Sequence, residues 1–388
     1  MTTTTHNPEH SDFARRIGLD DTITRLRADQ ERKRDEVVAA RDMYARGGRL
    51  MIRGAGEPVL GAHGVTTPPA GDFVISPTFE QGIADKLKIP QVYLRRIREA
   101  GRTDLFDRNV NAWLEETPNT KYLVRCWRGH HGGPGIARAL LSDTYKIINN
   151  YDLMLATLDG LRQVKGRFDI TTDISERRMY VRIRTRDITA AAPYLVRDYR
   201  SPLGTRAYGR DEPFVDAGAI ILNSEVGASR YSISPHYVFR VCSNGMTMVK
   251  DAKNLVHRGE RMPAGIVTWS EDTRRAEMTL IAKKTRDTVR TFLDVDFMLA
   301  KLHDVARDAG IPITDPAATL EHVATKNAYT DAEAATILAH FISGADLTAG
   351  GVLHAITSTA QTLQHPDRAA HLEATTLDAM ALAGTFRS

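Results

Sequence analysis

Residues 178–186 read Arg-Met-Tyr-Val-Arg-Ile-Arg-Thr-Arg, and this strict alternation of two kinds of side chain determines the fold class. Successive side chains of an extended chain point to opposite faces. One face would carry the apolar set Met179, Val181, Ile183 and Thr185. The other face, which we call the arginine ladder, would carry Arg178, Tyr180, Arg182, Arg184 and Arg186. The pattern predicts a strand with one face in the core.

The segments around this strand have the same period of two. We expect strands, in chain order, at Lys121–Arg128, Ile136–Leu141, Arg167–Ile174, Arg178–Arg186, Ala217–Leu222 and His236–Cys242, with a helix at Tyr151–Leu161. Asn244-Gly245 follows the last strand and predicts a tight hairpin turn, because both central residues of such a turn need a positive φ. We therefore predict an α+β fold with a largely antiparallel β-sheet flanked by helices.

Helical patterns lie before and after the sheet segment. Residues 12–46 predict a charged helix, and Ser76 and Pro90 mark the starts of two short helices, Thr78–Leu87 and a second that runs to Ala100. Apolar stripes near the C-terminus predict a helical module. The predicted organisation is a tail and charged helix at 1–53, a linker and helical hairpin at 54–120, an antiparallel sheet core at 121–295 and an acidic helical module at 296–388.

The composition is that of a globular protein. The chain has 388 residues, of which 42% are hydrophobic and 26% charged, enough to bury a sizeable core. No apolar run approaches the length of a membrane span, and the first residues do not resemble a secretion signal, so we expect a cytoplasmic protein without a membrane partner. Two cysteines, Cys126 and Cys242, are too few for a disulfide framework or a thiolate metal cage.

Charge is segregated along the chain. Residues 86–210 hold 24 Lys and Arg against 13 Asp and Glu, whereas residues 294–388 hold 5 against 12. This asymmetry indicates a basic surface for a polyanion and an acidic module that does not touch it. A genome that favours Arg codons would raise the number of arginines without any ligand, but it would not explain the segregation.

The arginine ladder is the candidate binding surface. Like charges along one face repel each other, and phosphates of a single strand of DNA would compensate them, with Tyr180 stacking a base. Arg125 and Trp127 share one face of an earlier strand and would extend this surface if the two strands were neighbours. The alternative is a sheet face whose arginines pair with acids on neighbouring strands.

Two further segments have a functional and a structural interpretation. Arg95, Arg96 and Arg98 lie on the second helix of a helix-turn-helix outline, but a packed helical hairpin is the simpler interpretation. The segment Gly129–Gly135 is rich in glycine like a phosphate-binding loop, yet no Lys-Ser or Lys-Thr follows it. We therefore expect it to be a hairpin tip.

An enzyme is the main alternative to a binding protein. Asp143 and Glu225 could hold a metal ion for phosphodiester chemistry if their strands were close together. The structural interpretation of Asn223-Ser224-Glu225 is a loop whose side chains satisfy backbone groups. The sequence lacks the common protease, hydrolase and nucleotide-binding motifs, and we predict no cofactor and no resident metal.

Several phrases occur in the order found in one known family. They are Ile89-Pro90 with Tyr93, Ala139–Asp143 with Tyr145 and Asn149, Asn223-Ser224-Glu225 with Gly227, Val241–Met246, and near the C-terminus Ala355-Ile356-Thr357, Ala360-Gln361 and Asp367-Arg368-Ala369. Over residues 75–380 the chain resembles the phage/plasmid-like protein family. That resemblance implies a mobile-element protein in a bacterial host and no established activity or catalytic residues.

These observations lead to one function and two alternatives. The chain is expected to be a non-enzymatic nucleic-acid-binding protein of a phage or plasmid, acting on single-stranded DNA in binding or annealing during recombination. The alternatives are a metal-dependent enzyme acting on nucleic acid, and a structural or host-interaction protein whose basic surface binds an acidic partner. Assembly into a homo-oligomer stays open.

Overall fold

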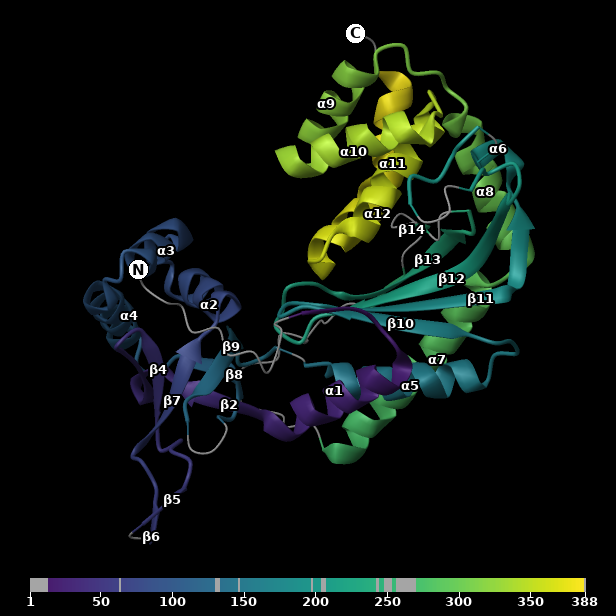
Figure 1. Ribbon diagram of the computed structural model, residues 1–388. Helices are drawn as coiled ribbons and strands as arrows, with labels where there is room; N and C mark the ends of the chain where they lie inside the picture. Colours follow the sequence, from purple (N-terminus) through teal and green to yellow (C-terminus); the bar gives the residue numbers. More distant parts are fainter. Residues whose placement is uncertain are drawn as a thin grey trace.

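The fold of the chain is α+β, as the alternating segments predict. The computed structural model describes residues 13–62, 64–129, 133–145, 147–196, 198–203, 207–241, 244–247, 253–255 and 270–386. Two large sheets each have their own hydrophobic core. The smaller body consists of residues 33–142 and the larger body of residues 14–32 together with 149–386; Figure 1 shows them side by side.

The larger body contains a seven-stranded antiparallel sheet. Its order is β1-β10-β11-β12-β13-β14, and β15 also pairs with β13. The strands are β1 (Ala14–Ile17), β10 (Asp169–Ile174), β11 (Met179–Ala191), β12 (Phe214–Asn223), β13 (Tyr231–Phe239), β14 (Asn244–Thr247) and β15 (Lys253–Leu255). The arginine ladder lies on β11, between β10 and β12.

Helices cover both faces of this sheet. One face packs against α1 (Leu19–Arg32), α5 (Asn150–Arg162) and α7 (Glu271–Phe292), which lie below the sheet in Figure 1. The C-terminal helices lie above it and around its end, as α8 (Val295–Ala309), α9 (Pro316–Lys326), α10 (Asp331–Gly344), α11 (Ala349–Thr362) and α12 (Pro366–Thr385). A short helix, α6 (Pro193–Val196), precedes β12. The predicted C-terminal helical module is confirmed.

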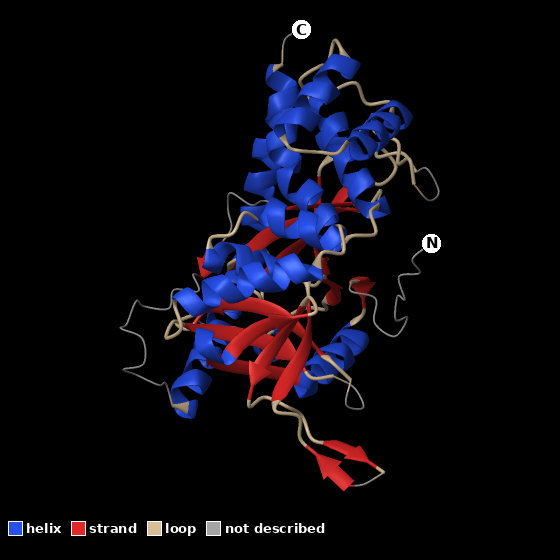
Figure 2. Ribbon diagram, turned by 90° about the vertical axis from the view of Figure 1, so that its left-hand side faces the viewer, coloured by secondary structure: helices blue, strands red, loops and turns tan. Residues whose placement is uncertain are grey.

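The smaller body contains a six-stranded mixed sheet with three helices. The sheet order is β2-β8-β9-β7-β4-β3, in which only β7 and β9 run parallel. The strands are β2 (Lys33–Ala39), β3 (Met43–Arg46), β4 (Arg49–Arg53), β7 (Ala70–Ile75), β8 (Lys121–Trp127) and β9 (Gly135–Ser142). A 3-10 turn at Ala40–Asp42 follows β2, and a two-stranded hairpin, β5 (Val59–Gly61) and β6 (Gly64–Thr66), projects from the sheet in Figure 2.

The predicted helical hairpin covers this second sheet. It consists of α2 (Pro77–Leu87) and α3 (Gln91–Glu99), and α4 (Thr103–Glu116) packs beside them. The Ser76 side chain accepts a hydrogen bond from the backbone N–H of Phe79 at 3.1 Å, which confirms the predicted helix cap. Leu94 and Phe106 are fully buried. The hairpin is therefore a packed element of the smaller body's core.

Two sequence predictions about strands and helices are corrected. Residues 12–46 do not form one helix, because only α1 is an α-helix and residues 33–39 and 43–46 are strands. Lys33–Ala39 pairs instead with Lys121–Trp127 of β8 along its whole length. The first two predicted strands, β8 and β9, belong to the smaller body's sheet and not to the sheet that holds β11.

The prediction that Asn244 and Gly245 form the centre of a hairpin turn is wrong. Asn244 and Gly245 lie within β14, opposite Phe239 and Val238, so they are not the central residues of the turn. The hairpin itself exists, but its turn includes Arg240. Cys242 and Ser243 lie outside the described residues. In the described part of the chain, no helix has the length and apolar character that a membrane crossing requires.

We expect Gly82→Ala to destabilise the smaller body. A Cβ at Gly82 of α2 would lie 2.8 Å from the carbonyl oxygen of Leu140 on β9, so helix and sheet would have to separate. Overpacking of this kind costs about 1–3 kcal/mol, which offsets the gain of about 1 kcal/mol in helix propensity. The free energy of unfolding in urea measures the effect.

A matched control for this substitution is Gly310→Ala at the end of α8. Gly310 has φ −74°, and nothing lies within 4 Å of the position that a Cβ would take there. Alanine at this residue should leave stability unchanged or raise it by about 0.4–1 kcal/mol. Equal effects of the two substitutions would contradict the close packing of α2 on β9.

Candidate functional site

The apolar face of β11 lies in the core, as predicted. Met179, Val181 and Ile183 are each 0% exposed. They belong to the same hydrophobic cluster as Leu153 and Met154 of α5. The alternation therefore identifies the buried face of the strand correctly.

The opposite face of β11 is internally paired, which corrects the expectation of a solvent-open arginine ladder. Arg182 forms ion pairs with Asp173 of β10 and, at 2.7 Å, with Glu373 of α12. Arg184 donates from Nε to Asp216 of β12 at 2.9 Å. The acids on both neighbouring strands and on the covering helix thus neutralise the centre of the ladder. A chain of phosphates has no access to Arg182.

The remaining residues of the ladder differ in burial and in pairing. Tyr180 is buried, and its hydroxyl donates to Asp367 of α12 at 3.0 Å, while burial raises its pKa. Arg178 lies 3.4 Å from the same carboxylate. Only Arg186 is well exposed, with 68% of its side chain accessible. Because Tyr180 is covered by α12, it cannot stack a base.

Arg125 and Trp127 do not extend the ladder, because β8 belongs to the other sheet. Arg125 is 0% exposed; it donates to both carboxylate oxygens of Asp35, at 3.0 and 2.7 Å, and to the carbonyl oxygen of Glu225 at 2.6 Å. Its role is structural. Trp127 is half-buried at the end of β8, and its ring lies 4.1 Å from the guanidinium of Arg138.

The chain crosses twice between the two bodies, and both crossings meet at Glu225. Lys33 begins β2, where the chain enters the smaller body, and its Nζ lies 2.5 Å from Glu225 Oε1. Asn150 begins α5 after the return crossing and donates its backbone N–H to the same oxygen at 2.7 Å. Arg138 of β9 donates to the other oxygen at 3.0 Å. Glu225 follows β12, so one carboxylate joins three distant segments.

Electrostatics keep this carboxylate ionised although it is 4% exposed. Burial alone would raise the pKa of Glu225, but the charges of Arg138, Lys33 and Arg125 outweigh burial and lower the pKa to about 2. Both carboxylate oxygens of Glu225 thus accept hydrogen bonds within a buried ion network.

The arrangement does not favour the proposed metal site at Asp143 and Glu225. Both Glu225 oxygens already accept hydrogen bonds from cationic side chains, which leaves no position for a metal ion. Within the described ranges, no group of three or more His, Cys, Asp and Glu side chains is placed to hold a metal ion. The loop interpretation fits better, because Ser224 accepts from the backbone N–H of Ala228 at 2.9 Å.

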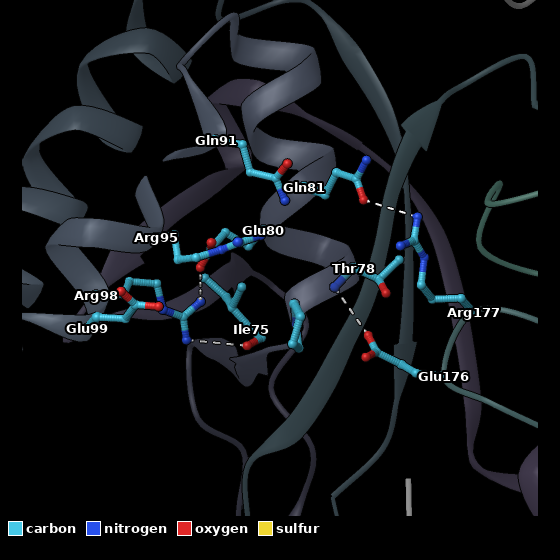
Figure 3. A pocket seen from close by; sticks show the side chains of 11 residues that line it. Ile75, Thr78, Glu80, Gln81, Gln91, Arg95, Arg98, Glu99, Glu176 and Arg177 are labelled. Carbon is cyan, nitrogen blue, oxygen red and sulfur yellow. Dashed lines mark hydrogen bonds and ion pairs between the residues drawn. The ribbon is translucent and has the colours of Figure 1, made fainter. Parts of the chain in front are cut away.

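A hollow of about 500 Å³ lies between the helical hairpin and the turn that joins β10 to β11. We call it the outer hollow. Figure 3 shows Arg95 and Arg98 of α3 on one side and Glu176 and Arg177 of the turn on the other. The lining residues are Ile75, Pro77, Thr78, Glu80, Gln81, Gln91, Arg95, Arg98, Glu99, Glu176 and Arg177.

The cations of the outer hollow are paired to different degrees. Arg98 forms an ion pair with Glu80 at 3.0 Å, and Arg177 donates to Gln81 at 3.2 Å (Figure 3). Arg95 is exposed and has no hydrogen-bond or ion-pair partner among the described residues. Its guanidinium is therefore available to a ligand.

A second hollow of about 30 Å³ adjoins the first, because Glu176 and Arg177 line both. We call it the inner hollow. It lies beside the Glu225 network. Its lining residues are Arg25, Leu26, Asp29, Lys33, Trp127, Arg138, Asn150, Ile174, Ser175, Glu176, Arg177, Arg178 and Glu225.

The inner hollow has buried hydrogen-bond donors without acceptors. In the described part of the chain, Nε of Arg138, Nε of Arg177 and Nε1 of Trp127 are buried and have no hydrogen-bond partner. Buried polar groups are nearly always hydrogen-bonded, so these N–H groups require an acceptor from outside the protein. Three unpaired donors around one hollow indicate a site for water or an anion.

The sequence predicts only part of this site. Trp127 and Arg178, expected on the ladder surface, instead line the inner hollow, and Arg95 and Arg98 of the helix-turn-helix outline line the outer one. The sequence analysis does not identify Lys33, Arg138 and Arg177, because no local pattern distinguishes them from the other basic residues. The adjacent pair Arg177-Arg178 in the turn between two predicted strands is the one available signal.

Comparisons with family models, curated proteins and solved structures found no match for this chain. Support for a function therefore comes from the residues and their geometry.

Proposed function

We propose that this chain binds single-stranded nucleic acid along the two adjoining hollows, which together we call the junction groove. The observation that carries the proposal is the excess of donors there. Seven cationic and five acidic residues line the groove, a formal difference of +2, and three buried N–H groups have no acceptor. Phosphate oxygens are acceptors that carry negative charge, and they would satisfy these groups.

The shape of the groove favours one strand over a duplex. The outer hollow has walls from α2, α3 and the β10–β11 turn. A duplex presents its phosphates on a wide convex surface, which can touch the rim of such a hollow but cannot enter it. A single extended strand can place successive phosphates beside Arg95 and Arg177.

The groove supports contacts to phosphates more than readout of bases. Trp127 is the aromatic residue of its lining, and Arg138 already stacks on the indole. We infer that binding has little sequence preference, as in proteins that bind single strands during recombination. A role on a phage or plasmid, which the family resemblance implies, belongs to the same proposal.

We expect Arg95→Ala to weaken binding of a labelled single-stranded oligonucleotide and to lower its salt dependence. If Arg95 contacts one phosphate, the slope of log K against log salt should fall in magnitude by about 0.7. Fluorescence anisotropy at several salt concentrations measures both quantities. Because Arg95 is exposed and unpaired in the described structure, the variant should keep its melting temperature.

The control for this experiment is Arg290→Ala. Arg290 is exposed on α7, outside the groove, and its replacement removes the same charge. This variant should leave affinity and salt slope unchanged. Equal losses in the two variants would show attraction to net charge alone. The absence of binding at low salt would overturn the proposal in favour of an acidic protein partner.

A further inference from the structure

The inner hollow is much smaller than the outer hollow, with which it shares Glu176 and Arg177. Its volume is about 30 Å³, against about 500 Å³ for the outer hollow. A nucleobase does not fit into that space, and a strand cannot continue through it. Only a small group at the end of a ligand can enter.

The lining of the inner hollow carries an excess of positive charge. Its cations are Arg25, Lys33, Arg138, Arg177 and Arg178, and its acids are Asp29, Glu176 and Glu225, a formal difference of +2. Asp367, which lies outside the lining and pairs with Arg178 at 3.4 Å, reduces this excess to +1. Two of the acids are already engaged: Glu225 by its ion network, and Glu176, which accepts the backbone N–H of Thr78 at 3.2 Å.

The unpaired N–H donors also restrict which ligand fits the inner hollow, because each donor needs an acceptor atom. Arg138 is only 6% exposed and lines the hollow with an Nε that has no acceptor within the described residues. Arg177 Nε and Trp127 Nε1 are likewise buried without an acceptor among the described residues. A phosphate monoester carries up to two negative charges and three acceptor oxygens, whereas an internal phosphodiester carries one charge and is attached on both sides.

We propose that the inner hollow binds the terminal phosphate of a nucleic-acid strand whose chain lies in the outer hollow. The inference rests on the proposed function and adds recognition of a strand end. A phosphorylated 5′ end and a phosphorylated 3′ end both present a phosphate monoester. The strand would approach past Arg95 and place its last phosphate between Arg138, Arg177 and Trp127.

The test compares three oligonucleotides of one sequence, with a 5′-phosphate, a 3′-phosphate or hydroxyls at both ends, each carrying an internal fluorophore. Anisotropy titrations should show about tenfold tighter binding for a phosphorylated end, since charge-assisted hydrogen bonds to a dianion are added. The end that gives the increase identifies the polarity of the strand. Arg95→Ala should weaken the binding of all three oligonucleotides by the same factor.

Trp127→Phe is the variant for the inner hollow, because it keeps an aromatic ring beside Arg138 and removes one unpaired N–H. It should reduce the preference for a phosphorylated end, measured as the ratio of the two affinities, at least threefold. The matched control is Trp113→Phe on α4, where Trp113 is 45% exposed and outside both hollows. It should keep the full preference.

The outcomes separate the two proposals. Equal binding of all three oligonucleotides, lowered by Arg95→Ala, keeps the nucleic-acid function and overturns the end site, with water filling the inner hollow. If no oligonucleotide binds, the nucleic-acid function fails, and inorganic phosphate is tested in a thermal shift at constant ionic strength. Stabilisation by phosphate that Trp127→Phe abolishes would retain an anion site, and no stabilisation would overturn both.

Discussion

Replacing Glu225 with glutamine should lower the free energy of unfolding by about 3–5 kcal/mol, the range for removing one member of a buried ion pair. Glutamine has nearly the same shape but no charge, so Lys33 and Arg138 would stay buried without a counter-ion. The single amide oxygen of glutamine can accept from Lys33 and the Asn150 N–H or from Arg138, so one side of the network would lose its acceptor. The midpoint and slope of urea denaturation, followed by circular dichroism, measure the loss.

The matched control is Glu99→Gln, which removes the same charge from an exposed position on α3. Its effect should stay within about 0.5 kcal/mol, as for most surface substitutions. A loss of less than about 1 kcal/mol in Glu225→Gln would show that water compensates the two cations and that the network does not hold the bodies together.

The same residue gives a pH signature with a defined sign. The native pKa of Glu225 is about 2 and lies below the usual value of 4.5, so the folded state favours the ionised form. Its stabilisation is complete above pH 4.5 and is lost as pH falls toward 2. The gap in stability between the native protein and Glu225→Gln should therefore be constant near neutral pH and narrow below pH 4.5.

Arg182→Met should cost stability on a similar scale, about 3–5 kcal/mol, and leave oligonucleotide binding by the folded protein intact. The substitution leaves Glu373, which is 3% exposed, without its ion-pair partner and removes one of the two arginines from Asp173. Methionine fills much of the volume, so the loss reports the uncompensated carboxylates. Denaturation in urea and anisotropy on the same sample measure the two effects.

The control lies on the same strand. Arg186→Met removes a cation whose side chain is 68% exposed and 3.9 Å from an equally exposed Asp169, so stability should change by about 0.5 kcal/mol or less. If Arg182→Met instead kept full stability and reduced the salt slope of binding, the arginine ladder would be an accessible ligand surface, and the structure would be contradicted.

The contrast between these two arginines shows how far the sequence predicts the molecule. Period-two alternation in residues 178–186 identifies the strand and its buried face, because that pattern is local. The other face pairs with Asp173, Asp216 and Glu373, which lie 9, 32 and 191 residues from their arginines along the chain, and no local pattern indicates them. The acidic C-terminal module contacts part of the basic segment, the reverse of the separation inferred from charge.

Helix caps are likewise predictable from local sequence, whereas the assignment of a strand to one of the two sheets is not. The Ser76 cap and the Thr330–Glu333 capping box are predictable, because a cap involves residues three positions apart. The assignment of β8 to the smaller sheet depends on its pairing with Lys33–Ala39, a segment whose spacing also fits a helix. The inner hollow combines Lys33, Trp127 and Arg177 from three distant strand ends, so its composition requires the tertiary structure.

The position of the smaller body within the chain has a consequence for biosynthesis. All of its strands and helices lie in the continuous segment 33–142, whereas β1 of the larger sheet pairs with β10, with Arg16 and Asp173 in contact across 157 residues. Contacts close in sequence form faster than contacts that must close a long loop. We expect the smaller body to fold on the ribosome as soon as β9 has emerged, when Ala14–Ile17 still lacks its partner strand. The folded smaller body then shortens the effective loop that must close when Ala14–Ile17 pairs with β10.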